Sequence, residues 1–387
     1  MKYIVIGIPD NTDFIIPEEI KSHPVFSGGK RHYELLKEQL PANHIWIDIQ
    51  GAMWLLFRQY KAYPVVVVFA SGDPLFYGFA NTISKYDPDA QLQVIPHFNS
   101  LQVLCHKCNF GYQEMYNTSV HGRSWDELDV ALINQHKMIG VLTDAEKDPA
   151  AIAQRMIEYG LDNYHMIVGE ALEGVDQKIR SLPLEEAAVA SFNKLNCVLL
   201  LRMGAVRKTF GIPDQQFAGL ENRPNMITKM PIRLASLSQL DLSHRLNFWD
   251  IGFCTGSVSI EAKKQFPHLQ ISAFEKRPEC DELFELNTRK HGTPGITKVM
   301  GDVFEEELPL AVDAVFIGGH GNRLPELISI IDKYLMPKGR VVINAVKPES
   351  KEQFITAVQE LNYRLLEPIE ITVDAHNPIT ILTAEKE

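Results

Sequence analysis

The chain has 387 residues, 45% hydrophobic and 22% charged, a balance that excludes disordered and fibrous classes and, at roughly 150 residues per domain, predicts two domains. Its 38 Lys and Arg against 49 Asp and Glu leave a net charge of −11, which argues against binding of nucleic acid or an anionic membrane through bulk charge. Five scattered cysteines, no apolar run longer than Val65–Ala70 and no signal-peptide pattern lead us to expect a cytoplasmic protein.

The first half alternates short β-branched runs with helical patterns, which predicts α/β architecture with largely parallel sheets. We expect strands at 3–7, 44–49, 65–70, 92–95, 137–142, 165–168 and 197–201. We expect helices near 74–85, 100–108, 124–134 and 149–159. A cationic stretch from Arg202 to Lys208 is the best boundary, so the predicted domains are 1–202 and 208–387.

The second half begins with an amphipathic helix and continues as alternating strands and helices. We expect helices at 229–240, 256–266, 278–291, 324–335 and 349–361. We expect strands ending near 252 and at 270–275, 296–300, 313–317 and 340–344, then an antiparallel hairpin of 364–373 and 378–384. A parallel sheet that ends in an antiparallel hairpin favours a Rossmann-like class I S-adenosylmethionine (SAM) methyltransferase domain over a plain dinucleotide-binding domain.

A nucleotide site is predicted where the first strand of this second half runs into a helix. Glycines in such a turn let the backbone approach a ligand, and the helix N-terminus presents free N–H groups. Glu275 ends the next strand, where a carboxylate binds ribose hydroxyls, and Gly301-Asp302 follows the strand after it, beside the adenine. The predicted cofactor-binding residues are Asp250, Gly252, Thr255, Gly256, Glu275, Gly301 and Asp302. Ordinary strand-to-helix turns and an NAD-dependent dehydrogenase are the alternatives.

The second half also resembles a known family. The runs Phe210–Asp214, Ile227–Lys229 with Arg233, Trp249–Gly252 and Ser257–Glu261 are similar to those of the decarboxylating precorrin methyltransferases of cobalamin biosynthesis. Phe316–Gly319 and Asn344–Val346 continue the resemblance, which covers residues 208–387. The family's usual Gly-x-Ala-Pro appears here as Gly301-Asp302-Val303-Phe304.

The first half resembles the tetrapyrrole methylases, and the resemblance implies a fold of two α/β subdomains. Ser71–Gly78 matches their most recognisable loop, and Gly28–His32, His121–Arg123, Thr143-Asp144 and Gly169–Leu172 match the precorrin branch. The resemblance implies cofactor binding by Gly7, Gly72 and Asp73. The opening turn departs from the family's Gly-x-Gly-Pro-Gly pattern, since it reads Gly7-Ile8-Pro9, and Pro9 lacks an N–H.

Both halves in one chain are the arrangement of the precorrin-6Y C5,15-methyltransferases (decarboxylating). The resemblance implies SAM-dependent C-methylation at C5 by the first half, and C15 methylation with decarboxylation of the C12 acetate by the second. The reaction would run from precorrin-6B to precorrin-8X, or between the cobalt-precorrin equivalents, and the sequence leaves both open. The resemblance also implies a homo-oligomer that binds a small tetrapyrrole. We expect it to bind no nucleic acid, no membrane and no resident metal.

The substrate's carboxylates need local cations, and Lys229 and Arg233 fall at i and i+4 on one predicted helix face. We predict these two as substrate-binding catalytic residues, with His320 as a proton donor to the ring after decarboxylation. Lys30, Arg31 and Arg123 are the equivalent cations of the first half. The alternatives are that Lys229 and Arg233 lie on a solvated helix face and that His320 is a solvated loop histidine.

Two other functions remain open from the sequence. In one, only the C-terminal domain is active, and the N-terminal half is a degenerate docking module, as the Gly7-Ile8-Pro9 turn suggests. In the other, the second half is a methyltransferase for RNA or protein, against which the acidic charge and the missing basic stripe count.

Overall fold

The computed structural model describes residues 1–387 except 10, 12, 207–208, 224–225, 310 and 374–377. The chain divides into two compact units. Unit 1 contains Met1–Arg123, His136–Gln154 and Tyr164–Met203, and unit 2 contains Ser124–Gln135, Arg155–Asn163 and Gly204–Glu387. The predicted start of the second domain, residue 208, lies outside the described residues. Across the described ranges, no helix is long and apolar enough to span a membrane.

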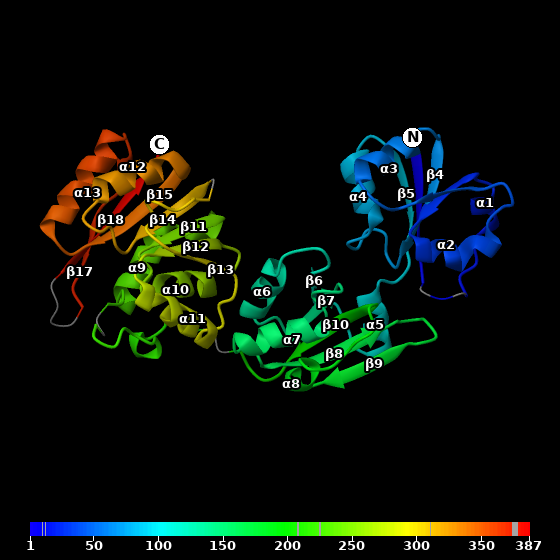
Figure 1. Cartoon of the computed structure of the whole chain (residues 1–387), viewed down its shortest axis with the longest axis horizontal. Helices are drawn as coiled ribbons and strands as arrows, with labels where there is room; N and C mark the ends of the chain where they lie inside the picture. The colour runs from blue at the N-terminus through cyan, green and yellow to red at the C-terminus, as the bar shows by residue number, and fades with distance from the viewer. Residues whose placement is uncertain (10, 12, 207–208, 224–225, 310, 374–377) are drawn as a thin grey trace. The chain divides into compact units, whose positions relative to one another are not determined.

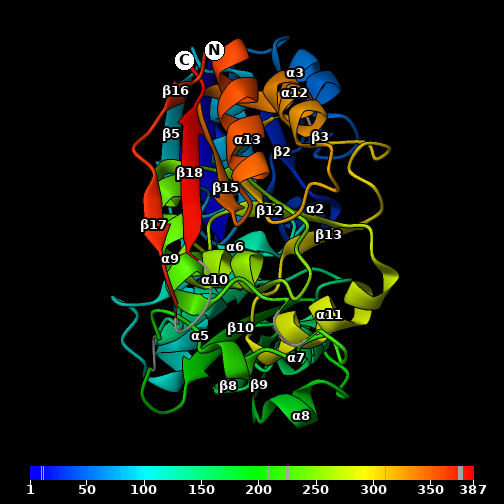
Figure 2. The same cartoon turned by 90° about the vertical axis from the view of Figure 1, so that its left-hand side faces the viewer.

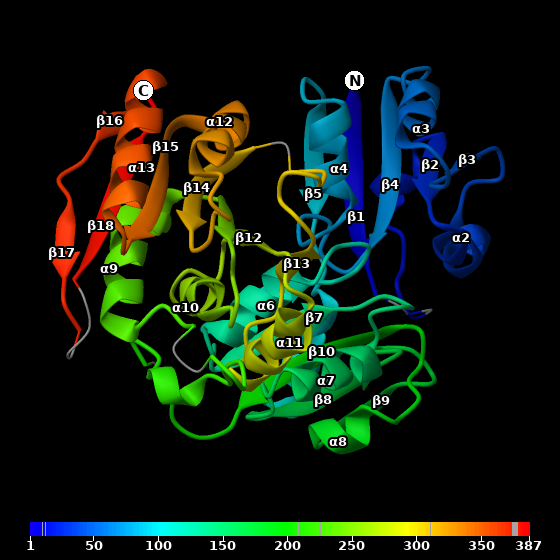
Figure 3. The ribbon, with the colours of Figure 1, turned by 60° about the vertical axis from the view of Figure 1, so that its left-hand side comes forward.

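The first sheet of unit 1 is fully parallel, in the order β3-β2-β4-β1-β5, and Figure 3 shows β1 between β4 and β5. Its strands are β1 (Lys2–Ile8), β2 (Val25–Gly28), β3 (Ile45–Asp48), β4 (Val65–Ser71) and β5 (Gln91–Ile95). Its helices are α1 (Glu18–Lys21), α2 (Lys30–Leu36), α3 (Met53–Tyr60) and α4 (Phe79–Tyr86). The apolar runs of β1 and β4 are buried almost throughout, as parallel strands covered on both faces require.

The second sheet of unit 1 has the order β6-β7-β10-β8-β9, and only its β6–β7 pair is parallel. The expectation of largely parallel sheets is therefore wrong for this part of the chain. Its strands are β6 (Tyr116–Ser119), β7 (Met138–Leu142), β8 (Tyr164–Glu170), β9 (Lys178–Leu182) and β10 (Asn196–Arg202). The helices along this segment are α5 (Ser100–Cys108), α6 (Asp126–Ile133), α7 (Pro149–Glu158) and α8 (Leu184–Ala187).

Unit 2 contains a sheet in the order β13-β12-β11-β14-β15-β18-β16, in which β18 pairs antiparallel with β15, β16 and β17. Figure 2 shows β18 between β15 and β17. The strands are β11 (Asn247–Ile251), β12 (Gln270–Glu275), β13 (Ile296–Met300), β14 (Val312–Ile317), β15 (Leu335–Ala345), β16 (Arg364–Leu365), β17 (Ile369–Ile371) and β18 (Ile379–Glu385). The predicted antiparallel ending of a parallel sheet is confirmed.

Helices cover both faces of this sheet, with α12 and α13 on one side and α9 and α10 on the other (Figure 1). From Gly204 onward, the helices of unit 2 are α9 (Met230–Leu240), α10 (Ser257–Gln265), α11 (Asp281–Lys290), α12 (Leu324–Tyr334) and α13 (Pro348–Glu360), and α6 belongs to the same unit. Adjacent residues of β11 show the two-sided burial, because Trp249 packs into the α12–α13 core and Phe248 into the α9–α10 core. This arrangement leaves the carboxyl ends of β11, β12 and β14 as the open edge where ligands bind in such sheets.

Candidate active sites

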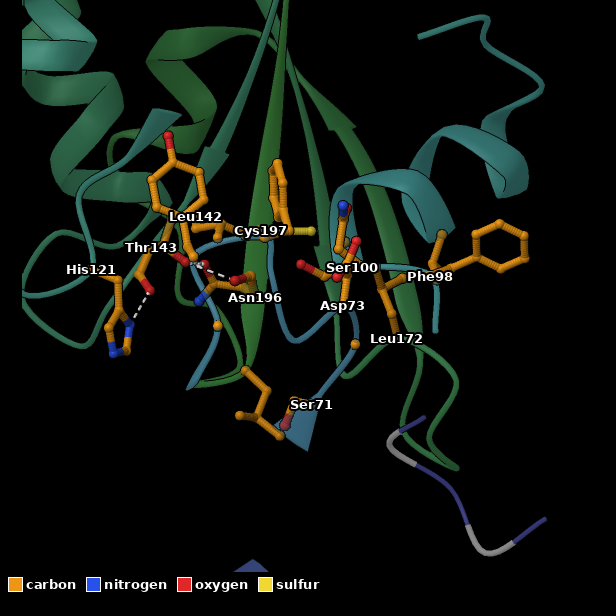
Figure 4. A pocket seen from close by; sticks show the side chains of 18 of the residues that line it. Ser71, Asp73, Phe98, Ser100, His121, Leu142, Thr143, Leu172, Asn196 and Cys197 are labelled. Atoms are coloured by element: carbon orange, nitrogen blue, oxygen red, sulfur yellow. Dashed lines mark hydrogen bonds between the residues drawn. The ribbon is translucent and has the colours of Figure 1, made fainter. Parts of the chain in front are cut away.

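Unit 1 contains a cavity of about 420 Å³, and Figure 4 shows residues that line it. The loop after β4 forms part of its wall. Gly72 in this loop has φ +61°, a left-handed conformation that favours glycine, and its N–H donates to the carbonyl of Ile8 at 3.0 Å. The loop thus joins the ends of β1 and β4 at the cavity, and the structure places the predicted Gly72 and Asp73 in its lining.

Gly7 lies behind this wall and is not among the residues that line the cavity. A Cβ atom at Gly7 would lie 2.1 Å from the carbonyl oxygen of Gly72 and 2.7 Å from the backbone nitrogen of His97. The lack of a side chain is what lets three backbone segments meet here. The prediction that Gly7 contacts the cofactor directly is therefore corrected: Gly7 has a packing role. Its neighbour Ile8 lines the cavity.

Asp73 shapes the loop through its own carboxylate. Its Oδ1 accepts the Leu75 N–H at 2.9 Å, which closes a short turn. The helix expected at 74–85 does not begin at Pro74, because these turns continue to Gly78 and α4 starts at Phe79. Asp73 thus lies six residues before the start of α4 and shapes the loop rather than the helix.

Polar side chains of the second sheet also line the cavity. Thr143 at the end of β7 donates its hydroxyl to the Asn196 side chain at 2.6 Å, and His121 contacts the Thr143 carbonyl through Nδ1 at 2.8 Å (Figure 4). Arg31 and Arg123 also line the cavity, whereas Lys30 does not. Two of the three predicted cations of the first half are thus brought to one cavity.

Unit 2 contains two adjoining cavities at the carboxyl ends of its strands, which we call the Lys229 cavity and the Glu275 cavity. They measure about 350 Å³ and about 310 Å³. Both are lined by Gly252, Gly318, Met226 and Arg277, so these residues mark the passage from one to the other. An elongated ligand with two chemically different ends fits such a pair.

The turn between β11 and α10 is built for close backbone approach. Gly252 has φ +80°, and a Cβ there would lie 2.7 Å from the backbone nitrogen of Gly319. Gly256, with φ +74°, ends the turn, and a Cβ there would lie 2.6 Å from the Phe284 ring. Cys254 also adopts a left-handed φ of 49°, with Sγ directed to the Met226 carbonyl at 3.2 Å.

Two buried polar atoms of this turn have no hydrogen-bond partner in the described part of the chain, Asp250 Oδ1 and Thr255 Oγ1. Both residues line the Lys229 cavity. The other oxygen of Asp250 accepts the N–H and hydroxyl of Ser259 at 3.1 and 2.6 Å, which fixes the carboxylate. Burial raises the pKa of Asp250 to about 7. A cationic ligand group would satisfy Oδ1 and favour the ionised carboxylate.

Glu275 ends β12 and lines the Glu275 cavity, as predicted, but its carboxylate is already engaged. Arg277 binds both oxygens through Nε at 3.0 Å and Nη2 at 2.6 Å, and the Cys254 N–H donates to Oε2 at 3.1 Å. Burial alone would raise the pKa of Glu275, but the Arg277 hydrogen bonds outweigh it and hold that pKa below its usual value. A ribose can reach Glu275 only when the Arg277 guanidinium gives up part of this pair.

Gly301 and Asp302 also line the Glu275 cavity. The Gly301 N–H donates to the Glu275 carbonyl at 2.9 Å, which holds the end of β13 against β12. Asp302 Oδ2 lies 3.5 Å from Lys276 Nζ, and both side chains are partly exposed. The two predicted acidic strand ends, Glu275 and Asp302, therefore meet at one cavity.

Lys229 and Arg233 do not form the cationic face that was predicted. Lys229, at the N-terminus of α9, lines its cavity, but the Arg233 side chain is 0% exposed and contributes nothing to the lining. Arg233 pairs with Glu261 and Asp214 at 3.3 Å each and donates to the carbonyls of Thr228 and Ile212. Its assignment as a substrate-binding residue is wrong, because burial places it inside the protein as a brace for the 210–214 loop.

His320 lies after β14 on the Glu275 cavity, away from the lining of the Lys229 cavity. Its Nε2 is 3.5 Å from Ser350 Oγ, and its Nδ1 has no partner among the described residues. Burial, assisted by the charge of Lys347, lowers the pKa of His320. A lowered pKa makes the neutral ring dominant near pH 7, which counts against the predicted proton donor.

Sequence reasoning missed Arg277, which borders both cavities of unit 2. Its position two residues after the strand-ending Glu275 was the available signal. Cys105 and Cys108, which are free thiols in α5, have no metal site around them, since no cluster of metal-ligating side chains exists within the described ranges.

Two family models match this chain, one in each half. The model of tetrapyrrole (corrin/porphyrin) methylases matches residues 14–188, and that of the precorrin methyltransferase domain matches residues 222–384. Together they contain most of the residues that line the three cavities.

Three curated relatives match this chain, one over most of its length and two over about half of it. A precorrin-6Y C(5,15)-methyltransferase (decarboxylating) of Sinorhizobium sp is 28% identical over 354 residues, which cover 88% of this chain and 82% of the relative. A cobalt-precorrin-6B C(15)-methyltransferase (decarboxylating) of Salmonella typhimurium is 30% identical over 190 residues, 45% of this chain and 95% of the relative. A cobalt-precorrin-7 C(5)-methyltransferase of the same organism is 31% identical over 192 residues, 48% of this chain and 89% of the relative.

Proposed function

This chain belongs to the family of precorrin-6Y C(5,15)-methyltransferases (decarboxylating), and from that premise we propose how its two units divide the reaction. Unit 1 methylates a precorrin at C5. Unit 2 methylates it at C15 and removes CO₂ from the C12 acetate. The proposal rests above all on one observation, that each unit has its own glycine-walled cavity with its own cations.

SAM is the cofactor that we propose for both units, and the residues of unit 2 fit it. Asp250 Oδ1 would accept a hydrogen bond from a cationic group, and Thr255 Oγ1 is free to bond the same end of the ligand. Glu275 and Asp302 suit the hydroxyls and amine of a nucleoside in the adjoining cavity. When bound, SAM supplies a methyl group activated by a sulfonium leaving group. In unit 1 the Gly72–Asp73 loop takes the corresponding place.

The chain's own residues bind and orient the substrate. In the Lys229 cavity, Lys229 and Arg277 are the cationic side chains among the described lining residues, and they would bind substrate carboxylates. Arg31 and Arg123 have that role in unit 1. Guanidinium–carboxylate pairs fix orientation through two parallel hydrogen bonds, and correct positioning alone can contribute about 7–11 kcal/mol to a group transfer. Binding of an acidic molecule by this acidic chain thus depends on local cations.

Mass spectrometry of the full chain with precorrin-6B, metal-free or cobalt-loaded, and isotope-labelled SAM tests the division. We expect Glu275→Gln to lose CO₂ release and one methyl addition while the other addition persists, because the neutral amide weakens ribose binding by about 1.5–3 kcal/mol, or about 10- to 150-fold in affinity. Asp302→Asn is the matched control, since Asp302 is more exposed and its loss should cost less. Wild-type CO₂ release by Glu275→Gln would contradict the assignment of Glu275 to the cofactor site of unit 2.

The raised pKa of Asp250 predicts a pH-dependent affinity in unit 2. Only the ionised carboxylate attracts a cationic ligand, so affinity for S-adenosylhomocysteine, which keeps the ammonium, should rise about tenfold from pH 6 to pH 8 around the pKa of about 7. The free energy of unfolding of the ligand-free chain depends on pH in the opposite direction. Folding raises the pKa of this carboxyl, so its contribution to stability is lost as pH rises through the raised pKa. Calorimetry on the wild type and Asp250→Asn isolates the effect, and equal pH slopes in both proteins would refute it.

The docking-module alternative rests on the Gly7-Ile8-Pro9 turn, whereas the two arginines that line the cavity of unit 1 favour an active first unit. The acidic net charge counts against the RNA- or protein-methyltransferase alternative. A cytoplasmic homo-oligomer stays a prediction.

A further inference from the structure

His121 is fixed in one tautomer at the rim of the unit 1 cavity. Its Nδ1 lies 2.8 Å from the carbonyl oxygen of Thr143, as the dashed line in Figure 4 shows. A carbonyl oxygen only accepts, so Nδ1 carries the proton, and in the neutral ring Nε2 holds the free lone pair. His121 is therefore presented as a base.

The other acids and bases along this cavity are less suited to accept a proton. Asp73 accepts the Leu75 N–H, and Glu173 Oε2 lies 3.4 Å from His97 Nε2. His121 is the one histidine among the described residues that line the cavity.

The loop that contains His121 is held firmly. The next residue, Gly122, donates its N–H to Asp144 Oδ2 at 2.8 Å, and Oδ1 of the same carboxylate accepts the N–H of Lys147 at 2.7 Å. The backbone hydrogen bond from Lys147 has the largest effect and that from Gly122 the next. Together they lower the pKa of Asp144 and keep it ionised. Arg123, two residues after His121, stacks over the Tyr77 ring at 5.2 Å. The two residues that follow the base are thus held in place.

Methylation of a ring methine carbon needs such a base. The methyl group arrives from a sulfonium without its bonding electron pair, which stays on sulfur, and the new C–C bond uses a π pair of the ring. The carbon then carries both a hydrogen and a methyl group, and the ring has gained one positive charge. Loss of the proton returns the electron pair of the C–H bond to the π system and removes the added positive charge.

We propose that His121 is the catalytic residue that takes this proton from the methylated C5 carbon. The C–H bond breaks, an Nε2–H bond forms, and the imidazolium later releases the proton to water. This inference rests on the proposed C5 methylation by unit 1 and names the base that it requires.

The test is His121→Asn in the full chain. The asparagine Nδ2 can donate to the Thr143 carbonyl as Nδ1 does, but it offers no base. We expect C5 methylation to fall by about 10²- to 10⁴-fold in kcat, the usual contribution of a general base. KM, the affinity for S-adenosylhomocysteine measured by calorimetry, and CO₂ release by unit 2 should stay within twofold.

Two further readouts distinguish a base from a structural residue. Added imidazole should restore C5 methylation to His121→Ala, and a substrate with deuterium at C5 should react more slowly than the protonated one in His121→Asn. Variant activity within threefold of the wild type, or no rescue and no isotope effect, would overturn the inference alone. A wild-type chain that adds no C5 methyl group would instead overturn the proposed function beneath it.

Discussion

Arg233→Met is expected to lower the free energy of unfolding by about 3–5 kcal/mol, the usual cost of leaving one partner of a buried ion pair uncompensated. Glu261, like Arg233, is 0% exposed, and it would keep the N–H groups of Gly211 and Ile212 and the Gln265 amide as neutral partners, with no cation to compensate its charge. Asp214 and the carbonyls of Thr228 and Ile212 would lose a donor as well. Chemical denaturation monitored by tryptophan fluorescence would measure the loss.

Lys229→Met is the matched control, since it makes the same substitution four residues earlier. Lys229 lines the cavity, so this change should raise KM for the substrate and leave stability within about 0.5 kcal/mol. If Arg233→Met were as stable as Lys229→Met and instead raised KM, the buried brace would be the wrong description and the original expectation of a substrate-binding arginine would stand.

Gly7→Ala is expected to reduce C5 methylation by about 100-fold, because a misplacement of about 1 Å in a binding wall can cost that much rate. The added Cβ would lie 2.1 Å from the Gly72 carbonyl oxygen, so the loop that carries Gly72 and Asp73 has to move. The two nearest atoms belong to the backbone, so no side-chain rotation can relieve the contact. CO₂ release and C15 methylation in unit 2 should be unchanged, which mass spectrometry of the products would show.

Gly29→Ala is the control for this prediction. A Cβ at Gly29 would meet only His32 Nδ1 at 4.0 Å, and its φ of −71° suits alanine. This variant should methylate as the wild type does. Normal C5 methylation by Gly7→Ala would mean that the Gly72 loop does not shape the cofactor site.

Sheet content was predictable wherever a strand is apolar and buried. The runs at β1 and β4, or at β12 and β14, can form little else, and their predicted positions agree with the structure to within two residues. The strands β2, β6 and β9 were missed because they are short or carry polar residues at exposed positions, so their pairing partners define them. The antiparallel order of the second sheet was missed for the same reason, since strand direction depends on connections that periodicity does not record.

The sequence by itself determined the strand-to-helix turn of the second half, since a glycine with positive φ followed by a helix is a local requirement. It likewise placed Glu275 and Asp302 at strand ends. Only the tertiary structure decided what surrounds these residues. Arg233 is buried and Gly7 packs behind the cavity wall because their partners, Glu261 and Gly72, come from distant segments. The tautomer of His121 depends on a carbonyl 22 residues away. Charge and spacing along a chain specify which groups are present, but long-range packing determines which of them face a ligand.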